Sequence, residues 1–257
     1  MIITISRFLL SKGSMALLFV LAVSPCIAQK EIIERNMQWI EYTAQLKCSE
    51  KYGVLVDGGY RWLDDYIKGP FYFIRAGMDY SLTEHVSVHA GFMHLGYFYE
   101  NETLRRIEHR PLQELNIRNE ACKVIFTQRL RVEERFFEPV SSDHAEPFNY
   151  FNWRFRYKIM IDIPLFSFSP DNPDYRLSLG VGDEIFINAG KRIIHNQFDQ
   201  NWFLISPTAH LGGDLNVAVT WSNQYSSTAT PGRFIHAQVI WLQVRQQFDL
   251  RKSGPAK

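Results

Sequence analysis

The clearest pattern in the chain is a pair of alternating segments between residues 123 and 164. In the first, charged or polar side chains recur at odd positions from Lys123 to Arg135, with mostly apolar side chains between them. In the second, from Phe151 to Ile163, aromatic and branched residues are odd and most charged residues are even. Successive side chains of a strand point to opposite faces, so each segment predicts a long β-strand with one charged and one apolar face.

Two adjacent strands of this kind need two different environments. We interpret the apolar face as contacting lipid and the charged face as lining the interior of a closed barrel. A soluble sandwich or barrel also alternates, with its apolar face inward. The length of the segments, often about ten residues or more as a tilted crossing requires, and the density of their charges favour the membrane barrel.

The same alternation recurs along the chain, and short and long connections alternate between the segments. Eleven segments are clear, and bacterial single-chain barrels normally have an even number of strands. Either residues 30–36 add a strand or the N-terminal segment threads the lumen. We favour the added strand and expect an antiparallel up-and-down barrel of about 12 (10–12) strands. Asp183 and Glu184 break the alternation and predict a bulge, and Tyr97–Tyr99 predict part of an aromatic girdle. The other expected strands are 39–47, 54–62, 72–82, 86–92, 108–119, 123–135, 151–163, 175–182, 198–210, 215–222 and 233–250.

The N-terminal residues predict an export signal. A basic start is followed by the short apolar run Met15–Val23 and by small residues that suit cleavage after Ala28. A membrane anchor is the alternative, but the run is too short to span a bilayer comfortably. Lipidation at Cys26 is disfavoured by Pro25 directly before it. The expected organisation is a signal peptide at 1–28 and one barrel domain at 29–257.

Composition fits this interpretation. The net charge of +1 gives no indication of nucleic-acid binding. A hydrophobic content of 46% with a mean hydropathy of −0.19 suits a barrel, in which every second residue meets lipid. After cleavage the chain keeps Cys48 and Cys122, both at expected turns, and a disulfide between them is left open.

The order of several short motifs resembles the domain-of-unknown-function 2490 family of Gram-negative outer-membrane β-barrel proteins. The resemblance extends from about Trp39 to Trp221 and implies the same fold and location, with no assigned activity. Trp202 departs from it, because the family tends to have Arg after this Asn. The motifs are Gly59-Tyr60-Arg61, Arg75 to Tyr80, Glu108 to Pro111, Arg129 to Glu133, Arg154 to Tyr157, Ile163 to Leu165, Asp183 to Phe186 and Phe198 to Asn201.

The candidate working residues are the charges expected inside the barrel. One interpretation is a salt-bridged network that fixes the strands in register, and the other is a passage or binding site for a small polar solute. These residues are Arg61, Arg75, Asp79, Glu108, Arg110, Glu114, Arg129, Arg131, Glu133, Arg154, Arg156, Lys158 and Glu184.

An enzyme is the alternative hypothesis. A membrane-embedded lipid hydrolase or acyltransferase would need a Ser and a His held together with a third group. His85, Ser87 and His89 share one face of a strand, but the parity places them inside, so we expect no catalytic residue. His85, His89 and His94 lack a carboxylate or Cys at a familiar metal-binding spacing, and we expect no metal and no cofactor.

The expected partners follow from the expected location, the outer membrane of a Gram-negative bacterium. The outer face would contact lipopolysaccharide and phospholipid. The last strand ends near Phe248, and a terminal aromatic residue there resembles the signal that the outer-membrane assembly machinery reads. The sequence predicts no nucleic-acid partner.

Overall fold

The computed structural model describes residues 30–64, 68–98, 104–140, 150–172, 174–212 and 214–251. The predicted signal peptide and Cys26 lie outside these residues. All regular structure in the described ranges is β-strand. Among the described residues there is no helix of the length and apolar character that a membrane crossing needs.

Alternating sequence and β-branched or aromatic content produce long strands along most of the chain. The strands are β1 (Glu31–Lys47), β2 (Tyr52–Leu63), β3 (Lys68–Ser81), β4 (Val86–Phe98), β5 (Leu104–Ala121), β6 (Val124–Pro139), β7 (Tyr150–Ser167), β8 (Tyr175–Ala189), β9 (Phe198–Leu211), β10 (Leu215–Ser227) and β11 (Arg233–Asp249).

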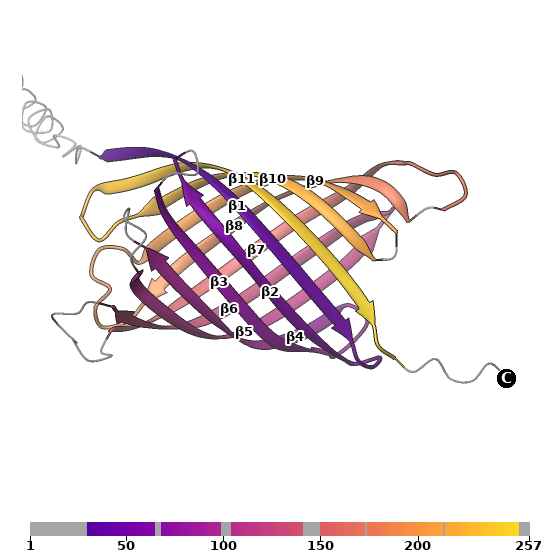
Figure 1. Cartoon of the computed structure of the whole chain (residues 1–257), viewed down its shortest axis with the longest axis horizontal. Coiled ribbons are helices and arrows are strands. Elements are labelled where there is room, and N and C mark those ends of the chain that lie inside the picture. The colour runs from indigo at the N-terminus through magenta and orange to yellow at the C-terminus, as the bar shows by residue number, and fades with distance from the viewer. Residues whose placement is uncertain are drawn as a thin grey trace, which may run out of the picture. The chain divides into compact units, whose positions relative to one another are not determined.

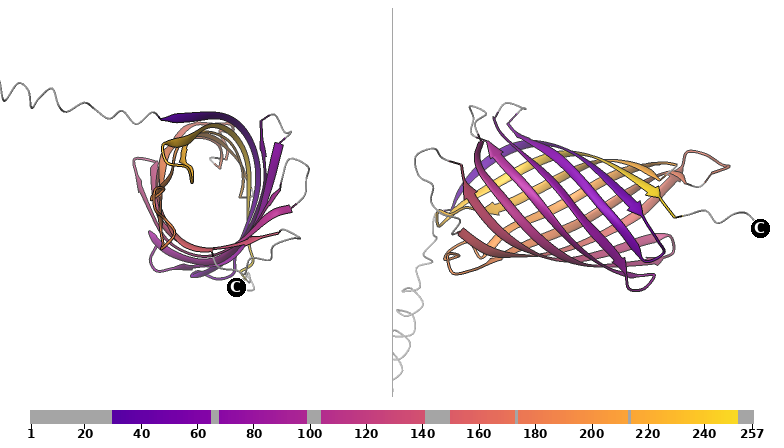
Figure 2. Two further views of the ribbon diagram at one scale, coloured as in Figure 1. Left: turned by 90° about the vertical axis from the view of Figure 1, so that its left-hand side faces the viewer. Right: turned by 60° about the horizontal axis from the view of Figure 1, so that its bottom comes forward.

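The strands form one closed barrel in chain order, and each consecutive pair is antiparallel. Figure 2 shows the strands forming a ring when the barrel is viewed from one end. The predicted all-β barrel is therefore confirmed. The described chain contains eleven strands, which lies within the expected range of 10–12 but differs from the preferred number of twelve.

The barrel closes between β1 and β11, and this pair is parallel. Residue numbers rise together along the two strands: the Glu34 carboxylate lies 2.7 Å from His236 Nδ1, and the Leu250 N–H donates to the Lys47 carbonyl at 2.9 Å. Figure 1 shows both arrows pointing the same way. Residues 31–36 do not form a strand of their own, because the chain continues from them without a turn into the rest of β1.

The hairpin turns after β1, β3, β5, β7 and β9 lie at one end of the barrel, together with the end of β11; we call this the turn end. The connections after the even-numbered strands and the start of β1 mark the loop end. The turn after β5 consists of Cys122 and Lys123, both with positive φ (52° and 68°), as a two-residue hairpin of the mirror-image type requires. Cys48 and Cys122 are both free and exposed, so the disulfide that the sequence left open is not formed.

The two faces of the barrel wall differ sharply. On the outer face, Leu130 and Phe155 are 51% and 45% exposed. On the inner face, Glu133 is 0% and Arg154 is 5% exposed. The charged rows of β6 and β7 therefore point into the barrel and the apolar rows point out.

The bulge expected at Asp183 and Glu184 is wrong. Both residues keep regular partners in β7, Ile159 and Lys158. Asp183 instead points outward, where the alternation predicts an apolar residue, and it accepts a hydrogen bond from the Asn201 side chain at 2.7 Å. The alternation breaks because a polar residue occupies an outward position, and the backbone stays regular. The register shift between β8 and β9 lies later, between Phe186 and Ile187.

The interior also contains apolar clusters beside the charges. Near β1 and β9–β11, Trp39, Trp202 and Val239 belong to one buried cluster. On β3–β5, Phe73 and Leu95 belong to a second one. The lumen is thus partly filled by side chains, as the narrow bore of a small barrel requires.

Candidate functional site

The main cavity of the described chain lies inside the barrel and has a volume of about 690 Å³. Its lining extends from Met37 and Ile235, toward the loop end, to Ser87 and Arg245, toward the turn end. Eleven cationic side chains line it, against four carboxylates. The cations are Arg61, Arg75, Arg106, Arg110, Arg129, Arg131, Arg135, Arg154, Arg156, Lys158 and Arg245, and the carboxylates are Glu41, Asp79, Glu114 and Glu184.

Glu133 on β6 is the centre of the ionic network. Arg154 Nε donates to its Oε2 at 2.8 Å, and Arg156 Nη1 donates to its Oε1 at 2.8 Å. Nη1 of Arg110 and Nη1 of Arg131 lie 3.6 and 3.5 Å from the same carboxylate. One fully buried anion therefore lies within ion-pair distance of four guanidinium groups, and its hydrogen bonds from Arg154 and Arg156 are charge-assisted, which makes them stronger than neutral ones.

Two further carboxylates extend the network toward its two ends. Toward the loop end, Glu108 accepts from Arg135 Nε at 2.6 Å and from Arg110 Nη2 at 2.9 Å. Toward the turn end, Glu184 accepts from Arg156 Nε at 2.8 Å and from Arg129 Nη2 at 2.6 Å. These contacts join strands β5 to β8 across the interior, so the network depends on the register of these four strands.

The remaining pairs are smaller. Arg75 Nε donates to Asp57 Oδ1 at 3.0 Å, and Arg131 Nη2 lies 2.5 Å from Glu114. His89 Nδ1 lies 2.9 Å from Asp79 Oδ1. In each pair both side chains point inward from directly neighbouring strands, so each pair follows from strand parity together with the observed register.

The structure brings the thirteen candidate charges into one interior. All except Glu108 and Glu133 line the cavity, and these two lie behind the arginines that do. Among the described residues, Arg61 and Lys158 make no ion pair. Sequence reasoning omitted Asp57, Arg106, Arg135 and Asp199, although the first three share their parity with residues that it selected.

A second inner feature lies toward the loop end. It consists of Trp39, Arg61, Phe71, Tyr97 and Arg106, and we call it the collar. Each member is the direct cross-strand partner of the next, from β1 to β5. The Arg61 guanidinium carbon lies 3.7 Å from the Trp39 ring centroid and 4.7 Å from that of Phe71. Phe71 stacks on Tyr97 at 5.0 Å, and the Arg106 carbon lies 4.3 Å from the Tyr97 centroid.

The collar corrects the expectation of an aromatic girdle at Tyr97–Tyr99. Tyr97 points into the lumen and lines the cavity, whereas Phe98 lies beside Tyr72, with 5.8 Å between ring centroids. Tyr99 lies outside the described residues. The parity of Tyr97 with the inward residue His89 was the signal that could have placed it inside.

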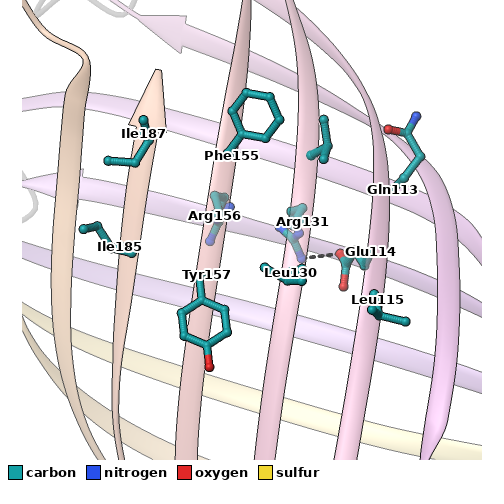
Figure 3. A pocket seen from close by; sticks show the side chains of 11 residues that line it. Gln113, Glu114, Leu115, Leu130, Arg131, Phe155, Arg156, Tyr157, Ile185 and Ile187 are labelled. Carbon is teal, nitrogen blue, oxygen red and sulfur yellow. Dashed lines mark ion pairs between the residues drawn. The ribbon is translucent and has the colours of Figure 1, made fainter. Parts of the chain in front are cut away.

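The outer wall carries an apolar groove of about 520 Å³ across β5–β8. Figure 3 shows Phe155, Tyr157 and Ile185 standing outside the strands, while the Arg131–Glu114 ion pair lies at the back of the same wall. The thickness of one sheet therefore separates apolar side chains on the outer face from charged side chains on the inner face.

The histidines considered for catalysis or metal binding lie apart from one another. His85 lies in an exposed turn, His89 pairs with Asp79, and His94 points outward beside His109, with 3.4 Å between their Nδ1 atoms. Among the described residues there is no group of three His, Cys, Asp or Glu that could hold a metal ion.

A serine and a histidine do meet elsewhere, at the turn end. Ser178 Oγ lies 3.0 Å from His210 Nε2 and donates to Asp162 Oδ2 at 3.0 Å. With its proton directed at Asp162, the hydroxyl oxygen accepts from His210, and the histidine is not placed to remove that proton. The carboxylate contacts the serine instead of the histidine, which is the reverse of a catalytic triad.

Comparisons with known proteins add a family. Curated proteins gave no match. A solved structure, a mutant of the ferric enterobactin receptor PfeA from Pseudomonas aeruginosa, is similar over 70% of this chain and 36% of its own, with 12% identity and a TM-score of 0.30. The family model for a protein of unknown function (DUF2490) matches residues 36–234. The resemblance found in the motifs is thereby confirmed, and the chain belongs to the DUF2490 family.

Proposed function

We propose that the chain is an outer-membrane β-barrel of a Gram-negative bacterium, whose ionic interior holds the wall in register and admits small polar solutes to its cavity. The observation that carries this proposal is the distribution of side chains across the wall. Large apolar residues are exposed outside, and buried charged residues line much of the inside. A water-soluble barrel would have the opposite distribution.

The outer face supports the lipid-facing part of the proposal. Exposed apolar residues recur on every strand from β1 to β4, including Ile40, Val56, Ile74 and Phe92. Soluble monomers rarely expose continuous apolar surfaces of this extent. In a bilayer the same surface contacts hydrocarbon, and the closed hydrogen-bonded wall leaves no strand edge unpaired.

The inner face supports two roles for the charges. The ion pairs around Glu133 and Glu108 are buried, and such pairs are tolerated because each ion finds an opposite charge. The cavity beside them keeps room for water and solute. We infer that register and solute access are both served by one set of side chains.

The partners belong to the same proposal. The outer surface would contact lipopolysaccharide and phospholipid, and the outward, 41% exposed Phe248 at the end of β11 would be read by the assembly machinery. The predicted export signal at residues 1–28 would bring the chain there. A lipid hydrolase or acyltransferase is not favoured, because the Ser178–His210 contact has the wrong hydrogen-bond direction for it.

The lipid-facing part is tested by Leu130→Arg in liposomes of defined phospholipid. Leu130 lies near the middle of β6 on the outer face. A cation in the middle of the hydrocarbon layer is expected to lower the unfolding free energy by about 2–4 kcal/mol. The measurement is a urea titration followed by tryptophan fluorescence.

The matched control is Leu250→Arg, which introduces the same charge at an exposed position directly after β11. It is expected to change the unfolding free energy by less than about 0.5 kcal/mol. Equal effects of the two substitutions would contradict the placement of Leu130 in lipid.

Solute access is tested separately by conductance across a planar bilayer that contains the purified barrel. Discrete current steps are expected if the cavity connects the two sides. If the barrel inserts but shows no current steps, the ionic interior serves only to hold the strands in register.

A further inference from the structure

We infer that the collar is a binding site for a small organic anion, namely a carboxylate carried on a flat apolar body. The inference deepens the proposed function and rests on it only for access of solutes to the lumen. It is carried by partly buried cations without a carboxylate partner, by the rings that contact these cations, and by the apolar surface that lies between them.

The first step concerns charge. Among the described residues, seven arginines of the cavity wall contact a carboxylate: Arg75, Arg110, Arg129, Arg131, Arg135, Arg154 and Arg156. Arg61 and Arg106, the two cations of the collar, contact none. Their Nε atoms are buried and have no hydrogen-bond partner. Both side chains are partly buried, and a cation that is partly removed from water without a counter-ion is costly, so these two positions favour an anion from outside the chain.

The second step concerns the direction of the free donors. Arg61 is stacked between Trp39 and Phe71, and Arg106 lies over Tyr97 and, at 5.2 Å, over Phe137. Both guanidinium groups therefore have aromatic rings and no carboxylate as near neighbours, so their N–H groups keep the capacity to bind an anion. A guanidinium edge matches a carboxylate in a bidentate pair better than any other side chain does.

The third step concerns the body of the ligand. Phe71 and Tyr97 line the cavity between the two arginines and are only partly buried. Trp39 is 4% exposed, and its indole Nε1 has no partner, which adds one more donor at the same height. Aromatic surface between two cations suits a flat apolar group attached to an anion.

The carboxylates near the collar do not remove the need for a ligand. Glu108 is engaged by Arg110 and Arg135, and Tyr97 also donates to it at 3.1 Å. Glu41, on the same strand as Trp39, lines the cavity without an ion pair to Arg61. The cavity lining as a whole has more cations than carboxylates, so its field attracts anions toward the collar.

The test is isothermal titration of the folded barrel in a non-ionic detergent, with sodium benzoate as the probe. Benzamide, which keeps the ring without the charge, and inorganic phosphate, which keeps the charge without the ring, are titrated alongside. Benzoate is expected to bind more tightly than either. Because this experiment needs no membrane and no conductance, its failure would leave the proposed barrel standing, and a failure of conductance would leave this result standing.

The variants are Arg61→Gln and Arg106→Gln, and Arg245→Gln is the matched control. Arg245 is a cavity cation toward the turn end, without an ion pair among the described residues. Loss of one charged donor pair is expected to weaken benzoate binding about tenfold to a hundredfold in the first two variants. The control is expected to change it less than about twofold.

Far-ultraviolet circular dichroism shows first that each variant is folded. If Arg61→Gln does not fold, Arg61→Lys replaces it: this variant keeps the charge without the planar edge, and about tenfold weaker binding is again expected. Equal binding of benzoate and benzamide, equal binding of benzoate and phosphate, or an equal loss in the Arg245 control would each overturn the inference.

Discussion

The two sides of the lumen are built from different chemistry. Strands β5–β8 present the ionic network, which we call the charged wall. Strands β9–β11 present mainly neutral groups inward: Ser206, Thr220, Ser222, Gln224, Ala237, Val239 and Gln243. Among the described inward residues of that side, Arg245 lies toward the turn end, Asp199 pairs with Arg154 and His210 contacts Ser178.

The two sides differ in how many strands a single polar group connects. On the charged wall a single carboxylate serves several arginines of different strands, so the loss of one anion affects all of them. On the other side, hydrogen bonds join immediate neighbours: the Ser206 and Thr220 hydroxyls lie 2.7 Å apart, and Thr220 donates to Gln243 at 2.8 Å. We therefore expect substitutions on the two sides to differ in cost, and the following variants measure this difference.

The largest effect is expected for Glu133→Gln. The substitution leaves Arg154 without its closest carboxylate and Arg156 with Glu184 alone, and it leaves four guanidinium groups close together. Removing one partner of a buried ion pair costs about 3–5 kcal/mol. The unfolding free energy from urea titration in detergent should fall by that amount, and an unchanged value would contradict the interdependence of the charged wall.

A smaller effect is expected for Arg129→Gln. Glu184 loses one donor but keeps Arg156 at 2.8 Å, so no buried charge is left uncompensated. The loss of one charge-assisted hydrogen bond is expected to cost about 1.5–3 kcal/mol in the same titration. A cost equal to that of Glu133→Gln would show that compensation by the remaining arginine has no effect.

The smallest effect is expected for Thr220→Val on the neutral side. This change of similar shape removes the hydroxyl between Ser206 and Gln243, both of which can turn to other partners. The expected cost is about 1 kcal/mol. Thr208→Val is the control, because its hydroxyl donates only a long bond of 3.4 Å to the Ser206 carbonyl, and its smaller cost would sharpen the comparison.

Much of the fold could be predicted from local pattern. Alternation in β6 and β7 identified the strands and their charged and apolar sides, because side-chain direction depends only on parity within a strand. The two-residue turn at Cys122 also lay where the sequence placed it. The closed barrel followed, because no open sheet satisfies two such faces.

The strand number could not be obtained in the same way. The even-number rule describes other barrels, and nothing in residues 30–36 distinguishes a separate strand from the start of a long one. Only the contacts of β1 with β11, such as Glu34 with His236, decide how the ring closes. Those contacts join residues about 200 positions apart, and no local pattern encodes them.

The candidate site was accessible to sequence reasoning only in part. Parity placed the charges inside, but it did not pair Arg129 with Glu184 or Arg154 with Asp199, which lie two strands apart. The inward aromatic residues were missed because the apolar character of a side chain was taken to predict the outer face, whereas its parity within the strand predicts the inner face. In the collar, Phe71 shares its parity with Arg75, and in this case parity was the better guide.

The parallel seam between β1 and β11 has a consequence for protein engineering. In a barrel whose first and last strands run in opposite directions, a short peptide can link those strands and the chain can be reopened at another hairpin. Here such a peptide would have to run back along the 17 residues of β11, roughly 55 Å of strand, to reach the start of β1. A short linker therefore cannot join the two ends of this barrel, so circular permutation would need a long one.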